Sequence, residues 1–142
     1  THEVPTSGNS RRGAALIELA LIMPLLISLV LICVDVGRFA TMHIAVTNAA
    51  REGANFGGMH RTTNATMGRW KSGIIGALTE EMSGVPGFSE EQLTIAEPVV
   101  ISSDTRSRVQ VEVTYKFKTA IAWPLIPDEL EVSRTAEMPV IR

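Results

Sequence analysis

The apolar positions of this chain fall into two patterns, one continuous and one periodic. The continuous pattern is residues 14–34, a run of 21 residues in which Glu18 is the single charged side chain. As an α-helix this run would be about 31 Å long, close to the thickness of the hydrocarbon layer of a bilayer. A helix on a soluble core would carry polar residues every three or four positions, and this run does not. The run therefore predicts a membrane-spanning helix.

A cleavable secretory signal is the alternative interpretation of the same run. Such signals have an apolar core of about 7–15 residues followed by a cleavage site with a small-x-small pattern. The run here is longer. The candidate sites at Ala40 and Ala54 fail, because Arg38 and Glu52 stand two residues before these alanines. We therefore favour a retained membrane anchor.

The charges beside the run predict its orientation. Arg11 and Arg12 directly precede it, whereas the residues after it are mixed in charge, with Asp35 and Arg38. Lysine and arginine are enriched on the cytoplasmic side of membrane helices. The N-terminus is therefore expected in the cytoplasm of a single-pass protein, and the region after the helix is expected to be exported.

The periodic pattern begins in the C-terminal half of the chain. Four apolar residues recur at intervals of four and predict an amphipathic helix that ends near Gly84: Trp70, Ile74, Leu78 and Met82. The sequence at 85–87, Val-Pro-Gly, is expected to break the chain direction after this helix.

Three further stretches predict β-strands. The first has apolar residues of one parity, with Pro98 indicating a sheet edge or a bulge: Leu93, Ile95, Val99 and Ile101. The second alternates strictly with polar residues: Val109, Val111, Val113, Tyr115 and Phe117. The third is interrupted by Arg134: Leu130, Val132, Ala136 and Met138. We expect a three-stranded antiparallel meander with the helix on its apolar face. The apolar loop at 123–127 is expected to plug the core, or else to form a contact surface.

These elements predict an α+β chain in three parts. Residues 1–13 would be a cytoplasmic leader, residues 14–57 the transmembrane helix with a helical extension, and residues 58–142 an exported head. The formal net charge of -2 argues against nucleic acid as a partner, because nucleic acid would call for a basic face. The lone cysteine, Cys33, lies in the apolar run, so no internal disulfide is expected.

The sequence offers little catalytic or metal-binding chemistry. His2, His43 and His60 are scattered and lack ligand-like spacing to cysteine or carboxylate residues. Neither a glycine-rich phosphate loop nor a nucleophile elbow is present. We therefore expect neither an enzyme nor a bound cofactor or metal.

The junction between the leader and the apolar run carries the most specific motif. Gly13 and Ala14 begin the apolar sequence, and Glu18 follows four residues after Ala14. A carboxylate one turn into a membrane helix is costly unless it is paired. Cleavage after Gly13 would give Ala14 an α-amino group, which is mostly protonated at neutral pH and could pair with Glu18 within one chain or between neighbouring chains. The alternative is that Gly13 only begins the helix and Glu18 extends to the interface.

Two further features of the helix bear on packing. Pro24 removes a backbone hydrogen bond within the run and predicts a kink or local unwinding. After the run, small residues recur every four positions: Ala45, Ala49, Gly53 and Gly57. Such a stripe lets another element approach closely, which suits either bundling with other helices or packing against the chain's own head.

The junction resembles the class III signal of type IV prepilins, which a membrane peptidase cuts after the glycine. The sequence from 11 to 57 further resembles TadE-like pseudopilins of the tight-adherence (Tad) pilus system. The similar stretches are 13–24 (GAALIELALIMP), 35–38 (DVGR) and 48–54 (NAAREGA). Leu19 and the sizeable exported region distinguish the chain from major pilins of that system, which are shorter and typically carry Tyr after the Glu. The related TadG-like proteins are generally longer.

The resemblance implies a pilin-like protein of the bacterial inner membrane with its head in the periplasm or in an extracellular pilus. Its implied partners are the prepilin peptidase, other pilins or pseudopilins, and the assembly machinery. Two other functions remain open. One is a membrane-anchored binding module of the cell envelope, and the other, less favoured, is a subunit of a membrane enzyme.

Overall fold

The computed structural model describes residues 8–60, 62–102, 106–121 and 127–141, with side chains from residue 13 onward. Most of the apolar loop predicted at 123–127 lies outside these residues. The chain divides into two compact units, one up to Gly37 and one from Arg38 onward. The helical extension that follows the apolar run is thus part of the same compact unit as the head.

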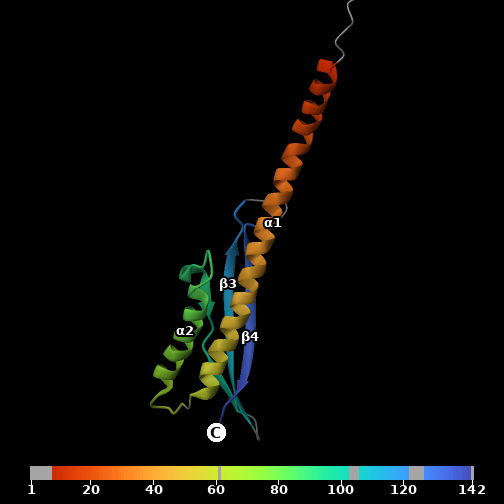
Figure 1. Cartoon of the computed structure of the whole chain (residues 1–142). Coiled ribbons are helices and arrows are strands. Elements are labelled where there is room, and N and C mark those ends of the chain that lie inside the picture. Colours follow the sequence, from red (N-terminus) through yellow and green to blue (C-terminus); the bar gives the residue numbers. More distant parts are fainter. Residues whose placement is uncertain (1–7, 61, 103–105, 122–126, 142) are drawn as a thin grey trace, which may run out of the picture. The chain divides into compact units, whose positions relative to one another are not determined.

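The first unit contains the N-terminal part of helix α1, which runs from Gly8 to Met59 (Figure 1). Large apolar side chains of this part, such as Leu16, Leu21 and Leu25, are exposed. By length and composition, α1 is the one helix among the described residues that is long and apolar enough to cross a membrane. The helix begins at Gly8 and not directly after Gly13 as the sequence suggested. The polar residues before Gly13 are compatible with helical geometry, so composition alone does not fix the helix start.

The second unit combines the rest of α1 with a helix and a sheet. Helix α2 runs from Met67 to Ser83, a short 3₁₀ helix η1 covers Glu90–Gln92, and the strands are β1 (Leu93–Ile95), β2 (Val99–Ser102), β3 (Ser107–Lys118) and β4 (Glu129–Pro139). The four residues that predicted the amphipathic helix are its buried residues: Trp70, Ile74, Leu78 and Met82. The α+β class is confirmed.

The break after α2 follows from its sequence. The amide of Val85 donates to the carbonyl of Met82 (3.0 Å), and the amide of Phe88 donates to the carbonyl of Val85 (3.1 Å). Residues 85–88 thus form a turn with Pro86 in its second position and Gly87 in its third. Gly87 has a φ of 82°, which a residue with a Cβ rarely adopts.

Strand β3 is the centre of the sheet, and every pairing with it is antiparallel. Strands β1 and β2 pair with β3 along one side, and β4 pairs with it along the other. The predicted alternation of β3 is confirmed, because its apolar residues are all buried: Val109, Val111, Val113, Tyr115 and Phe117. The order of the predicted strands as an antiparallel meander is also correct.

The number of strands differs from the prediction, because the first predicted strand is two. Leu93 lies opposite Tyr115 in β1, whereas Val100 lies opposite Val109 in β2, so the register shifts by one residue between the two short strands. A shift of one residue exchanges the two faces of the strand, so every side chain after the shift points to the face opposite to the one predicted. The sheet has four strands as a result, and Pro98 lies in the interruption, as its bulge signal indicated.

The prediction that the apolar residues of one parity between Leu93 and Ile101 share one face is wrong, because the register shifts between β1 and β2. Val99 is 52% exposed and Ile101 is 41% exposed, while Val100 between them packs against the core.

Strand β4 shows why Arg134 interrupts its apolar pattern. Its position is opposite Val113, on the face of the sheet that is otherwise apolar. The side chain is exposed and contacts the imidazole of His43 in α1, and it also donates to the carbonyl of Ser133 (2.8 Å). The charged group therefore remains near solvent at the margin of the core, as long amphipathic side chains commonly do.

Helix α2 packs against the apolar face of the sheet, and the second half of α1 joins it there. The second half of α1 contributes small and apolar residues that pack with those of β3 and α2. They share one core with the strand residues: Met42, Ala45, Val46, Ala49, Ala50 and Ala54. The helical extension is thereby an integral part of the head.

Candidate functional site

The residues of the junction motif lie on the exposed surface of α1. Gly13 is partly exposed, and a Cβ at this position would meet no atom within 4 Å. Ala14 and Glu18 are both exposed. Because they are four residues apart in a helix, they lie one above the other on the same face. A cation at Ala14 and the Glu18 carboxylate would thus be neighbours.

Pro24 lies inside α1, and the helix continues on both sides of it. Proline at this point lacks the amide that would donate to the preceding turn. Its carbonyl accepts a hydrogen bond from the Ser28 hydroxyl (2.8 Å), four residues later. A Ser hydroxyl bonded to this carbonyl is one of the local devices by which helices adapt to a proline.

The four residues of the small-residue stripe, Ala45, Ala49, Gly53 and Gly57, are all buried in the head. A Cβ on Gly53 would lie 2.9 Å from Leu78 Cδ1, and a Cβ on Gly57 would lie 2.8 Å from Val109 Cγ1. Of the two interpretations that the sequence left open, these contacts correspond to packing against the chain's own head.

The C-terminal end of α1 is held by side-chain and backbone donors from three places. The indole Nε1 of Trp70 in α2 donates to the carbonyl of Gly57 (3.1 Å). The amide of Ile141 donates to the carbonyl of Gly58 (3.1 Å). The carbonyl of Phe56 accepts from the His60 amide (3.1 Å). Carbonyls of a last helical turn lack partners within the helix. Here α2 and the segment after β4 provide them.

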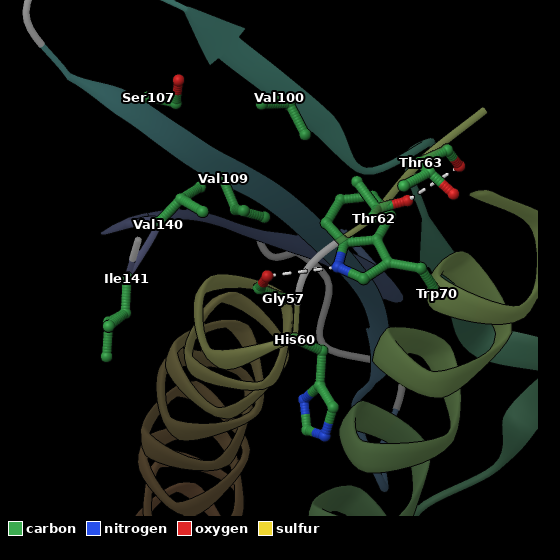
Figure 2. Close-up of a pocket in the computed structure, with 10 residues that line it drawn as sticks. All are labelled: Gly57, His60, Thr62, Thr63, Trp70, Val100, Ser107, Val109, Val140 and Ile141. Atoms are coloured by element: carbon green, nitrogen blue, oxygen red, sulfur yellow. Dashed lines mark hydrogen bonds between the residues drawn. The ribbon is translucent and has the colours of Figure 1, made fainter. Parts of the chain in front are cut away.

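A cavity of about 530 Å³ opens beside this helix end (Figure 2). It lies between the end of α1, the start of α2, strands β2 and β3, and the segment after β4. Its lining combines apolar side chains with hydroxyls and one imidazole: Gly57, His60, Thr62, Thr63, Trp70, Val100, Ser107, Val109, Val140 and Ile141. The sequence analysis did not predict this cavity. One feature of the sequence could have indicated it. Trp70 lies in the first turn of the predicted amphipathic helix, on its buried face, where the indole N–H needs an acceptor.

Among the described residues that line the cavity, no serine lies beside the histidine. Figure 2 shows Ser107 and His60 on different sides of the cavity, so no hydroxyl–imidazole pair forms between them. The His60 ring stacks on Phe56 with centroids 4.0 Å apart, and its Nδ1 lies 2.9 Å from the carbonyl of Phe56. Across the described part of the chain, no group of three His, Cys, Asp or Glu side chains is placed to hold a metal ion.

One perturbed carboxylate lies on the surface of the head and is not part of the lining of the cavity. Lys71 in α2 hydrogen-bonds to Glu97, which follows β1. This hydrogen bond, together with the charge of the Lys71 ammonium, lowers the pKa of Glu97 below its ordinary value. Glu97 is well exposed, so the pair is a surface contact and not a reactive centre.

Comparison with known proteins locates one family in this chain. The family model described as TadE-like protein matches residues 13–55. Neither a search of curated proteins nor a search of solved structures returns a match. The matched stretch includes Gly13, Glu18, Pro24 and most of the small-residue stripe, and it ends before α2. The resemblance seen in the sequence is therefore confirmed: the helical segment 13–55 of this chain is similar to TadE-like proteins.

Proposed function

We propose that this protein is a membrane-anchored minor pilin or pseudopilin that supports assembly of a Tad-type pilus. The TadE-like match at residues 13–55 carries this proposal, because it covers the processing motif and the membrane helix together. The head lies outside the match except for the helical extension.

The proposed location is the bacterial inner membrane, with the N-terminus in the cytoplasm and the head in the periplasm or in an extracellular pilus. The charge bias at Arg11 and Arg12 supports this orientation. The proposed partners are a prepilin peptidase, other pilins or pseudopilins, and the assembly machinery. Protease added outside spheroplasts should digest the head; protection of the head there would contradict the orientation.

Processing is the first test of this proposal. If the peptidase cuts the bond between Gly13 and Ala14, the mature protein from cells that contain the enzyme should begin at Ala14. Gly13→Leu should retain the leader, because a bulky residue would not fit a site selective for glycine. N-terminal sequencing of membrane-extracted protein measures both outcomes. A leader retained on all of the native protein would exclude a prepilin.

Glu18 is the proposed partner of the new amino terminus. It lies four residues after Ala14 on the same face of α1, where a carboxylate within lipid needs compensation. Pairing within one chain or between two chains would provide that compensation. The second possibility couples cleavage to assembly, since only the processed chain carries the amine.

Replacement of Glu18 tests this pairing. Glu18→Gln is nearly isosteric, so helix packing is preserved while the charge is removed. We expect normal cleavage and membrane insertion, but at least a several-fold lower yield of crosslinked complexes with other pilins. Leu19→Gln is a matched control that places the same amide one position away. Assembly of Glu18→Gln at the parental level would mean that the carboxylate merely extends to the interface.

A second candidate function is a membrane-anchored binding module of the cell envelope. The open cavity at the end of α1, with its hydroxyl groups and imidazole, is the observation that favours it. A simple anchor has no need of a processed N-terminus. The sequencing experiment therefore separates the two functions.

A further inference from the structure

A smaller pocket lies where the head begins, and its lining is cationic and polar. Arg38 contributes from α1, Gly87 from the turn after α2, Gln92 from η1, and Tyr115, Phe117 and Lys118 from β3. Its volume is about 100 Å³, enough for roughly three water molecules or one tetrahedral oxyanion. The set of described residues that line it contains two cationic side chains and no carboxylate.

Packing holds the Arg38 guanidinium at this pocket. Its Cζ lies 5.4 Å from the centroid of the Phe117 ring, a cation–π arrangement. The Phe117 ring in turn meets Phe39 edge to face at 5.5 Å. On the other side, Arg38 Nη2 lies 3.8 Å from the point that a Cβ on Gly87 would occupy. The guanidinium is thus held between β3 and the turn that contains Gly87.

The second cation and the neutral donors complete the set. Lys118 Nζ lies 3.3 Å from Glu129 Oε1 in a pair whose members are both exposed, and such pairs are weak enough to share the ammonium with another anion. The Tyr115 hydroxyl donates to Gln92 Oε1 (2.8 Å) and accepts from the Ser89 amide (3.2 Å). Because Oε1 is the acceptor in this bond, the other atom of the Gln92 amide is its NH₂ donor group.

Arg38 has other contacts within the chain, but a guanidinium carries five N–H donors and can serve two acceptors at once. An oxyanion in this pocket would therefore meet donors from α1, η1 and β3. Arginine and lysine together on one small anion are typical of phosphate recognition.

The position of Arg38 in the sequence indicates where such a phosphate would come from. The apolar run ends at Val34, and four residues of α1 correspond to a rise of about 6 Å. The polar headgroup layer adds roughly 5–8 Å on each side of the hydrocarbon layer. Arg38 thus falls at the depth of the lipid phosphates on that side of the membrane.

We propose that this pocket binds the phosphodiester of a membrane phospholipid, so that the start of the head is held to the bilayer surface. The proposal depends on the membrane helix. It does not depend on cleavage after Gly13 or on a role in a pilus, so the two proposals can fail separately.

Native mass spectrometry of the full chain, delipidated in detergent, tests the proposal with three probes. These are dioctanoyl phosphatidylglycerol, dioctanoylglycerol as the same lipid without phosphate, and inorganic phosphate. We expect one bound phosphatidylglycerol per chain and no comparable adduct of dioctanoylglycerol. The double variant Arg38→Gln/Lys118→Gln should bind phosphatidylglycerol at least tenfold more weakly.

The matched control is Arg51→Gln/Lys116→Gln. It removes the same two charges from the same helix and the same strand, at exposed positions that do not line the pocket. Equal binding of phosphatidylglycerol by the two double variants would overturn the proposal. Saturation of the site by inorganic phosphate, with no lipid adduct, would assign it to a soluble anion and overturn it as well. Thermal unfolding followed by circular dichroism identifies a misfolded double variant, in which case Lys118→Gln alone is compared with Lys116→Gln.

Discussion

The two halves of α1 use apolar residues in opposite ways. Up to Gly37 the helix carries large aliphatic side chains, and these are exposed; Leu25, for example, is 71% exposed. From Arg38 onward its inward face is built largely of alanine and glycine, and these small residues are buried. In water, the exposed leucines would cost about 25 cal/mol for each Å² of apolar surface. The first half therefore needs an apolar surrounding from outside the chain, whereas the second half finds its surrounding within the head.

The largest expected difference between the two regions is the effect on stability of truncating one leucine in each. Leu78→Ala removes a side chain that is 0% exposed in the head, and such changes cost about 2–5 kcal/mol because a cavity remains. Leu25→Ala should leave the unfolding of the head unchanged. Urea unfolding of the full chain in detergent, followed by tryptophan fluorescence, measures both. Equal losses would mean that the two regions unfold as one unit.

Substitution of a glycine in each half of α1 is expected to show a second, smaller difference in the stability of the head. Gly57→Leu would force new atoms toward Val109 Cγ1 and Ile74 Cδ1, which lie 2.8 and 2.9 Å from a Cβ at this site. Overpacking of this kind costs about 1–3 kcal/mol. A Cβ at Gly37 would meet nothing within 4 Å, so Gly37→Leu should not destabilise the head. The same urea titration compares the variants; a stable Gly57→Leu would show that the interface between α1 and α2 can expand.

The smallest expected effect concerns a contact on the surface of the head. Since Lys71 lowers the pKa of Glu97 in the folded protein, the unfolded chain binds more protons as the pH falls. The pair therefore stabilises the fold above about pH 4.5, and this contribution is lost as the pH falls through the lowered pKa. Lys71→Gln should be slightly less stable than the parent at neutral pH and equal to it in acid. Thermal unfolding at pH 7 and in acid below the lowered pKa of Glu97 compares the two variants, and a difference that persists in that acid would assign the effect of Lys71 to packing.

Much of the fold could be predicted because its signals are local. The four-residue spacing of Trp70 to Met82 and the strict alternation from Val109 to Phe117 each depend on one element alone. The division of β1 from β2 could not be predicted, because the one-residue shift depends on how both strands align with β3. Pro98 indicated an irregularity without giving its direction.

The candidate site also has a part that could be predicted from local sequence and a part that could not. Gly13, Ala14 and Glu18 could be proposed as a processing motif because the pattern depends on spacing within one helix, and their role stays a prediction. The partner of the small-residue stripe could not be predicted, because close approach by an outside helix and by the chain's own head require the same residues. The cavity beside Trp70 and the pocket at Arg38 join segments that are far apart in the sequence. Their lining was therefore visible only in three dimensions.

The margins of the sheet have a consequence for crowded conditions. Strand β4 places Arg134 on its apolar face, and the opposite margin is divided into two short strands around Pro98. Inward charges, bulges and prolines are devices that discourage a sheet from adding strands of another molecule. These features would disfavour edge-to-edge strand pairing among many copies concentrated in one place. Ordered contacts between copies are left to the helices and loops.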